Sequence, residues 1–230
     1  MIRHVFMDLD NTLLDFSKAE AIAVKKTLKT LGIECPEAVI RRYSQLNLAQ
    51  WKLLELGTLT REQVKIRRYQ LLFNELGTDA SPQEAARIYE ELLAVGHYFI
   101  DGAEWLLDSL YGRYKLYLAT NGTAAVQNSR LKSAGIRRYF EYVFISEELD
   151  CNKPSKDFFE RCFQNIPDFK TEEAVMVGDS LSSDILGGIN AGIKTVWFNQ
   201  ELIKSTNTGA VRPDCMIKTL KELPGVLETM

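Results

Sequence analysis

Two carboxylates separated by one residue follow a short apolar run near the start of the chain. The run is Val5-Phe6-Met7, and the acids are Asp8 and Asp10. In an extended segment, residues two apart project to the same side. Two carboxylates that close repel each other, and one binds a proton unless a cation lies between them. Oxygen ligands suit Mg²⁺, which also binds phosphate groups, so we expect a magnesium site at this point.

Polar residues also follow three later apolar runs, at 116–119, 142–145 and 174–177. In chain order they are Thr120-Asn121-Gly122, Lys153-Pro154, and Gly178-Asp179-Ser180 with Asp184. A hydroxyl and loop amides ahead of a helix pattern make an anion site, and a lysine adds a positive charge. Each feature alone has an ordinary explanation, such as a helix cap for Asp179. Their joint occurrence, each after an apolar run, is harder to explain in that way.

The elements that must position these residues alternate along the chain. Besides the runs above, 195–198 is apolar, and helical patterns cover 123–134, 155–165 and 181–191. Alternating strands and helices predict an α/β fold with a Rossmann-like, doubly wound parallel sheet. Ligands bind beyond the carboxyl ends of the strands in such sheets. The polar residues lie at those ends.

Residues 16–98 interrupt this alternation with helix signals alone. Ser17-x-x-Glu20 and Thr60-x-x-Gln63 fit capping boxes, and Ser81-Pro82 fits a third helix start. Gly57 and Gly77 are candidate helix ends. We therefore expect about four helices, forming an all-helical cap over 16–98 inserted into an α/β core of 1–15 and 99–230.

Composition excludes several classes of protein. The net charge of -3 does not favour nucleic-acid binding. Four scattered cysteines and two histidines give no zinc or disulfide pattern. No apolar stretch reaches the 18 or so residues of a membrane span, and the N-terminus does not resemble a signal peptide. These observations predict a cytoplasmic protein that acts neither on nucleic acid nor in a membrane, and they leave the oligomeric state open.

The order of the motifs resembles the haloacid dehalogenase superfamily. Its phosphatases carry D-x-D-x-T, a Ser or Thr after the second strand, a distant lysine, and G-D-x-x-x-x-D. This chain has Asp8-Leu9-Asp10-Asn11-Thr12, Thr120, Lys153-Pro154, and Gly178-Asp179 followed by Asp184. The resemblance extends from residue 5 to about 198, and the insert matches the helical cap of the family's first type.

The resemblance implies a role for each matching residue. Asp8 would be the nucleophile that forms an aspartyl phosphate, and Asp10 would protonate the leaving group and later activate water. Phosphate would bind to Thr120, Asn121, Gly122 and Lys153. Mg²⁺ would bind to Asp8, the main-chain carbonyl of Asp10, Asp179 and, directly or through water, Asp184. The substrate would be a small phosphate monoester.

A finer resemblance is to the bacterial pyrimidine 5′-nucleotidases of this superfamily. It rests on four stretches: Tyr43-x-x-x-Asn47-x-x-x-Trp51, Gly57-x-Leu59-Thr60 with Arg68, Ile145-Ser146-Glu147-Glu148, and Asp184 to Gly192. It implies substrates such as UMP, dUMP or dTMP. Because the core would contact mainly phosphate, we expect four cap residues to read the base or sugar, with packing between cap helices as the alternative role: Phe16, Asn47, Trp51 and Arg68.

Other activities remain open at this stage. A sugar-phosphate phosphatase or a phosphomutase shares the same motifs. A non-catalytic phospho-acceptor domain has a similar acidic pair, but it is about half this length and has no helical insert. A dehalogenase typically lacks the second acid that Asp10 supplies. One departure from the relatives is Asp150, where a glycine is common. Because Asp tolerates a left-handed conformation, we expect little consequence.

Overall fold

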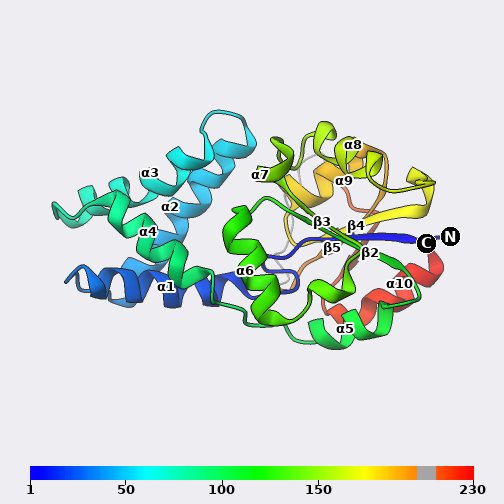
Figure 1. Ribbon diagram of the computed structural model, residues 1–230, viewed down its shortest axis with the longest axis horizontal. Helices are drawn as coiled ribbons and strands as arrows, with labels where there is room; N and C mark the ends of the chain where they lie inside the picture. The colour runs from blue at the N-terminus through cyan, green and yellow to red at the C-terminus, as the bar shows by residue number, and fades with distance from the viewer. Residues whose placement is uncertain (201–210) are drawn as a thin grey trace. The chain divides into compact units, whose positions relative to one another are not determined.

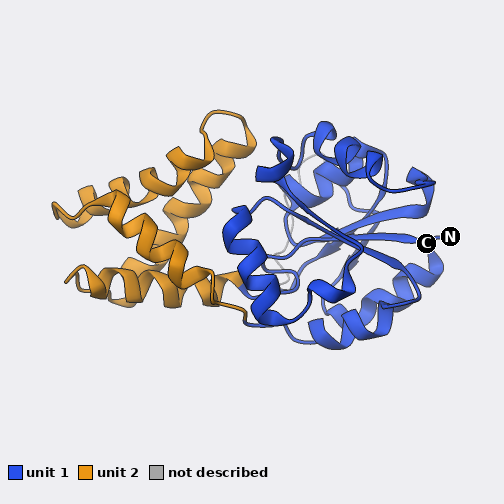
Figure 2. Cartoon of the chain, viewed as in Figure 1, with its two compact units in different colours: residues 1–15, 98–230 blue, residues 16–97 orange. Residues whose placement is uncertain are grey.

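The computed structural model describes residues 1–200 and 211–230 of the chain. These residues divide into two compact units, shown in blue and orange in Figure 2. The core unit comprises Met1–Asp15 and Tyr98–Met230, and the helical unit comprises Phe16–His97. The expected boundaries differ from these by one residue. That the two units are separate core and cap domains stays a prediction.

The core unit contains a single six-stranded parallel sheet, ordered β3-β2-β1-β4-β5-β6 (Figure 1). The strands are β1 (His4–Met7), β2 (Lys115–Thr120), β3 (Tyr142–Ile145), β4 (Ala174–Gly178), β5 (Lys194–Phe198) and β6 (Cys215–Ile217). The chain winds outward on both sides of β1, which places the topological switch point beside the first motif. The expected doubly wound α/β fold is confirmed.

Helices connect these strands and cover both faces of the sheet. They are α5 (Ala103–Leu110), α6 (Ala124–Ala134), α7 (Ser146–Leu149), α8 (Lys156–Gln164), α9 (Leu186–Ala191) and α10 (Leu223–Thr229). A π-helical turn, η3 (Leu181–Ile185), precedes α9, and short 3-10 turns occupy Arg137–Tyr139, Thr171–Glu173 and Leu220–Glu222. The helices expected near 123–134, 155–165 and 181–191 are therefore confirmed, whereas α5, α10 and β6 were not anticipated.

Alternate residues of the buried strands enter two separate hydrophobic cores. On the face covered by α5 and α10 (Figure 1), Val5 and Met7 pack with leucines of those helices. On the opposite face, covered by α8 and α9, Phe6 packs with Phe158 and Phe159 of α8. Burial on both faces explains why the strands are continuous apolar runs rather than alternating ones.

Two adjacent glycines allow close packing beneath the sheet. A Cβ atom on Gly187 would lie 2.7 Å from the Phe159 ring, and one on Gly188 would lie 2.6 Å from the Thr195 methyl group. Such contacts are shorter than van der Waals packing permits, so larger residues there would displace α9. The glycines therefore serve helix packing.

The helical unit contains α1 (Phe16–Thr30), α2 (Glu37–Glu55), α3 (Arg61–Leu76) and α4 (Pro82–Leu93). The Thr60–Gln63 capping box and the Ser81 cap are confirmed, and Gly57 and Gly77 end their helices with positive φ. The capping box expected at Ser17 is wrong. Helix α1 begins at Phe16, so Ser17 lies inside the helix and not at its cap. The Glu20 carboxylate accepts hydrogen bonds from the side chains of Ser44 and Asn47.

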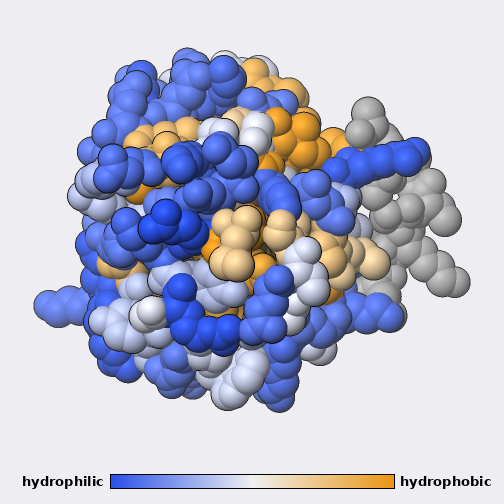
Figure 3. Space-filling view, turned by 90° about the vertical axis from the view of Figure 1, so that its right-hand side faces the viewer, coloured by the Kyte–Doolittle hydropathy of each residue, from blue (hydrophilic) through white to orange (hydrophobic). Residues whose placement is uncertain are grey.

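Among the helices that the structure describes, none has both the length and the apolar character needed to cross a membrane. The face of the molecule drawn in Figure 3 is mainly hydrophilic, and hydrophobic residues gather there only in limited patches.

Candidate active site

Three acidic side chains meet at the carboxyl ends of β1 and β4. Asp8 follows β1 directly, Asp179 follows β4, and Asp184 lies in the π-helical turn η3. One carboxylate oxygen from each lies within 4.8 Å of the others. The sequence-based expectation that these acids lie together is therefore supported by their positions. β1 and β4 are adjacent parallel strands, so both motifs emerge at the same edge.

Lys153 contacts two acids of this group and is 1% exposed. Its Nζ donates to Asp8 Oδ1 at 2.7 Å, to Asp184 Oδ1 at 2.6 Å and to the Ala119 carbonyl at 2.6 Å. These three acceptors use the three donors of a lysine ammonium. The two carboxylates raise the pKa of Lys153 against the opposing effect of burial. The lysine is thus held charged beside Asp8.

Lys153 does not fully compensate the burial and mutual repulsion of these acidic side chains. Burial, followed by the neighbouring carboxylates, raises the pKa of Asp8 to about 7 against the opposing effect of Lys153. Burial and the charges of Asp184 and Asp8 also raise the pKa of Asp179. Such shifts mark carboxylates that lack a compensating cation.

A divalent cation would supply the missing charge. Asp8, Asp179 and Asp184, when ionised, place three negative charges beside one buried cation, Lys153. The surplus of two negative charges matches the charge of Mg²⁺. Carboxylate oxygens are also the donors that Mg²⁺ prefers. The residues present therefore fit a magnesium ion.

Glycine is required at Gly178 to make room for one of these acids. A Cβ atom there would lie 2.2 Å from Asp184 Oδ2. That oxygen accepts a hydrogen bond from the Ser180 main-chain N–H at 3.0 Å. The other oxygen accepts from Lys153. The G-D-x-x-x-x-D spacing thus brings Asp184 back over the end of β4, with both of its oxygens engaged.

Thr120, the last residue of β2, presents a buried hydroxyl with a defined orientation. Its Oγ1 accepts from Gln127 Nε2 at 2.8 Å and from the Gly122 main-chain N–H at 3.2 Å. Because these two bonds use the oxygen's lone pairs, the hydroxyl proton is left to donate outward. A donor of this kind suits a phosphate oxygen. The Gly122 amide acts through Thr120 here, and direct phosphate binding by Gly122 stays a prediction.

Asn121 has a role that the sequence did not suggest. Its side-chain Oδ1 accepts from the Lys153 main-chain N–H at 2.9 Å, and its Nδ2 donates to the Lys153 carbonyl at 2.9 Å. This paired bond anchors the segment that carries the lysine. The paired bond joins the loop after β2 to the loop after α7. Helix α7 is capped at its C-terminal end by Asp150, which has a φ of 52°. The left-handed conformation expected at Asp150 is confirmed.

Asp10 is held by two residues that sequence reasoning missed. Its Oδ1 accepts from Arg130 Nη1, and its Oδ2 accepts from Gln127 Nε2 at 2.8 Å. Both partners lie one turn apart on α6. The only sequence signal was their spacing of three residues on a helix that follows the Thr120 loop.

In the helical unit, two of the four expected substrate-reading residues are buried. Asn47 is 2% and Arg68 is 3% exposed. Arg68 Nη1 donates to Asn47 Oδ1 at 2.9 Å, and Asn47 Nδ2 donates to Glu20 Oε1 at 2.6 Å. The other two, Phe16 and Trp51, are half-buried. Direct substrate contact by any of the four stays a prediction.

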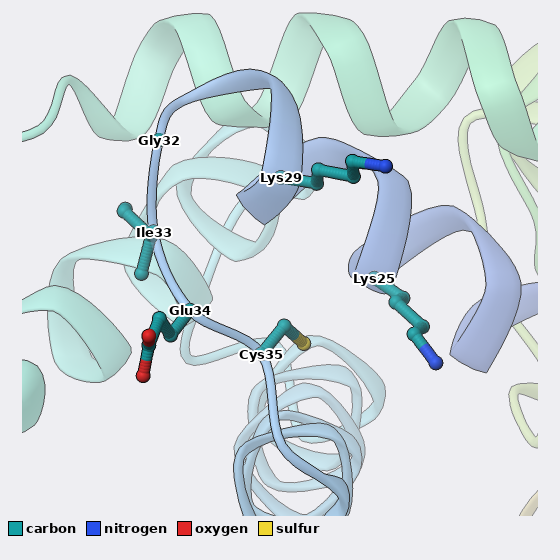
Figure 4. A pocket seen from close by; sticks show the side chains of 6 residues that line it. All are labelled: Lys25, Lys29, Gly32, Ile33, Glu34 and Cys35. Carbon is teal, nitrogen blue, oxygen red and sulfur yellow. The ribbon is translucent and has the colours of Figure 1, made fainter.

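A separate pocket of about 360 Å³ lies within the helical unit. It is lined by Lys25, Lys29, Gly32, Ile33, Glu34 and Cys35 (Figure 4). In that view the Glu34 carboxylate and the two lysine ammonium groups extend away from one another. The pocket shares no residue with the set predicted to bind substrate, and no polar groups converge in it.

Comparisons of this sequence with known proteins agree on one protein family. The model of the haloacid dehalogenase-like hydrolases matches residues 5–198. Pyrimidine 5′-nucleotidase PynA of Streptococcus pneumoniae is 42% identical over 198 residues, covering 86% of this chain and 84% of that protein. Pyrimidine 5′-nucleotidase YjjG of Escherichia coli is 28% identical, covering 97% and 96%.

A solved structure resembles the whole chain. It is the HAD-hydrolase YfnB of Bacillus subtilis bound to magnesium, with a TM-score of 0.93, 33% identity and 99% coverage of both chains. This structural agreement and the family match over residues 5–198 point to the same protein family. The chain belongs to the haloacid dehalogenase-like hydrolases, and it is an enzyme of the hydrolase class.

Proposed function

We propose that this chain is a Mg²⁺-dependent phosphatase that hydrolyses nucleoside 5′-monophosphates, with UMP, dUMP and dTMP as preferred substrates. The observation that carries the proposal is the placement of Asp8. This carboxylate lies at the end of β1, bonded to Lys153 and within reach of two further acids. A nucleophile held between an ammonium group and a divalent-cation site suits attack on a phosphate dianion.

The proposed reaction proceeds in two steps. The Asp8 carboxylate attacks phosphorus while the bond to the leaving oxygen breaks, and Asp10 donates a proton to that oxygen as the nucleoside departs. Asp10 then accepts a proton from water, whose oxygen attacks the same phosphorus and displaces Asp8. Inorganic phosphate leaves, and both aspartates return to their starting state. Thr120 and Lys153 stabilise charge on the phosphoryl oxygens.

Magnesium, when bound, supplies the positive charge that lets the phosphate dianion approach an acidic pocket. The residues that would hold it are Asp8, Asp179 and Asp184, with the main-chain carbonyl of Asp10. Their carboxylates already lie close together. The relative YfnB has been solved with magnesium bound, which supports magnesium as the metal.

We propose that the helical unit selects the nucleotide. The names of PynA and YjjG supply the substrate class. Phe16 and Trp51, both half-buried aromatic residues, would stack against the base. Stacking of a base on an aromatic ring contributes about 1–3 kcal/mol. Asn47 and Arg68 would contact substrate only by exchanging their present mutual hydrogen bond for one to the nucleotide.

The test is phosphate release from a panel of nucleoside monophosphates and sugar phosphates, with Mg²⁺ and with EDTA. We expect metal-dependent release that is fastest with pyrimidine nucleotides and abolished in Asp8→Asn. Activity confined to sugar phosphates would preserve the chemistry and overturn the nucleotide assignment. An Asp8→Asn variant as active as the wild type would overturn the mechanism.

A further inference from the structure

Helix α6 carries two buried polar side chains that no part of the established family motif includes. Gln127 is 1% exposed and Arg130 is not exposed at all. Arginine is almost never buried in this way unless it is paired. Burying a guanidinium costs several kcal/mol before its partners offset that cost. Arg130 forms an ion pair with Asp10, the predicted acid–base residue. This pair offsets part of the cost of burying the guanidinium group.

The two side chains bind opposite oxygens of the Asp10 carboxylate. Arg130 Nη1 donates to Oδ1, and Gln127 Nε2 donates to Oδ2 at 2.8 Å. Two donors on two oxygens define the plane of the carboxyl group as well as its position. The Asp10 side chain is nevertheless 27% exposed, so the group held in this way still faces outward.

Gln127 is itself held in one orientation. Its Oε1 accepts from Arg130 Nη1 at 3.0 Å, which directs the amide nitrogen toward Asp10. That nitrogen has two protons, and the second is donated to Thr120 Oγ1 at 2.8 Å. A continuous chain of hydrogen bonds therefore runs from Arg130 through Gln127 to both Asp10 and Thr120.

Gly122 makes room for this chain. A Cβ atom at that position would lie 2.3 Å from Gln127 Nε2 and 2.5 Å from Gln127 Cδ. Any larger residue would push the Gln127 amide out of its place. The Thr120-Asn121-Gly122 segment thus contributes a space as well as hydroxyl and amide groups.

We infer that Gln127 and Arg130 are positioning residues that hold the Asp10 carboxyl for proton transfer to the leaving oxygen and hold the Thr120 hydroxyl toward the phosphate. The inference rests on the proposed phosphatase function. In the first step the Asp10 O–H bond breaks, the proton passes to the leaving oxygen, and the electron pair stays on the carboxylate. Arg130 and Gln127 keep that carboxylate in place through the transfer.

The main test compares two substrates whose leaving groups differ in their need for a proton. A nucleoside leaves as an alkoxide and needs protonation, whereas p-nitrophenolate leaves readily without it. The quantity to measure is kcat/KM, because it covers the steps up to departure of the leaving group and excludes hydrolysis of the aspartyl phosphate.

For Arg130→Lys and Gln127→Asn, we expect kcat/KM on UMP to fall about tenfold further than kcat/KM on p-nitrophenyl phosphate. Asp10→Asn sets the upper limit of this difference. Lys132→Ala, an exposed residue of the same helix, should change neither value. Equal losses on the two substrates, or no loss, would overturn the role at Asp10, since a residue needed only for folding or only for the Thr120 hydroxyl lowers both values together.

A second measurement does not depend on turnover. Crystal structures of the wild type, Gln127→Asn and Gly122→Ala should show the Asp10 carboxyl in one orientation in the wild type and turned in the variants. An unchanged Asp10 in both variants would contradict the inference. If the wild type hydrolyses neither substrate, the proposed function fails, and the crystal structures alone decide whether the two residues position Asp10.

Discussion

A buried cation of the core unit, Lys153, and one of the helical unit, Arg68, differ in the number of acidic side chains around them. Lys153 in the core unit is bonded to two carboxylates of a group of three acidic side chains. Arg68 in the helical unit is linked through Asn47 to a single acid, Glu20. Its guanidinium carbon lies 4.5 Å from the centre of the Tyr89 ring.

The difference separates a ligand site from a structural cluster. Within the helical unit, Asn47 links Arg68 to Glu20, and the guanidinium carbon of Arg68 lies within 6 Å of the centres of three tyrosine rings. Burial raises the pKa of Glu20, and the hydrogen bonds from Ser44 and Asn47 and the charge of Arg68 oppose that shift; among the residues that the structure describes, no second carboxylate contributes to it. Around Lys153, by contrast, the pKa of both Asp8 and Asp179 is raised by burial and like charge. That group is satisfied only when a cation binds.

The largest effect is expected from Lys153→Met. Loss of the ammonium group beside Asp8 removes a charge that stabilises the phosphoryl oxygens, so kcat/KM on UMP should fall about 10²- to 10³-fold. Steady-state kinetics measures this, and Lys156→Met, an exposed lysine three residues later, is the matched control. Activity within twofold of the wild type would remove Lys153 from the mechanism.

Arg68→Met should instead act on stability. It leaves the buried Glu20 carboxylate without its counter-charge, which we expect to lower the free energy of unfolding by about 3 kcal/mol. Urea denaturation measures the change, and Arg67→Met, the exposed neighbour, should have little effect. A stable Arg68→Met variant that has lost its preference for nucleotides would instead favour direct substrate contact.

Trp51→Ala should change substrate preference. If the indole stacks on the base, kcat/KM on UMP should fall about tenfold while kcat/KM on p-nitrophenyl phosphate changes little. Trp105→Ala, at a half-exposed tryptophan of the core unit, is the control. Equal losses on both substrates would mean that Trp51 packs between helices and does not read the base.

A further effect is a pH dependence of stability in EDTA. The unfolded chain releases the Asp8 proton near pH 3.8, whereas the folded protein retains it to about pH 7. The folded state therefore binds more protons in this range, so the Asp8 contribution to stability falls as the pH rises from about 4 to about 7.

Thermal unfolding of the wild type and Asp8→Asn, compared at pH 5 and pH 7.5, isolates this contribution. We expect Asp8→Asn to raise Tm relative to the wild type by a few degrees more at pH 7.5 than at pH 5. Added Mg²⁺ should stabilise the wild type more at pH 7.5, since fewer protons compete with it there. The reverse order in either experiment would contradict the raised pKa.

The positions of the site residues could be predicted where they depend on the fold alone. Asp8 and Asp179 come directly after strands of one parallel sheet, and Thr120 is the last residue of another strand of that sheet. The apolar runs identified those strands. The capping signals of α3 and α4 were equally local and were confirmed. The three-residue strand β6 was too short to give a pattern. The box at Ser17 failed because the tertiary contacts of Glu20 outweighed a local capping preference.

The sequence by itself determined the family, the fold class and which carboxylates gather at one edge of the sheet, since these follow from motif order and the geometry of parallel strands. Only the tertiary structure decided which partner each side chain takes. Asp10 meets Arg130 across 120 residues of chain, and Lys153 meets Asp8 across 145. Contacts between residues so far apart depend on how helices pack on the sheet, and no local spacing encodes them.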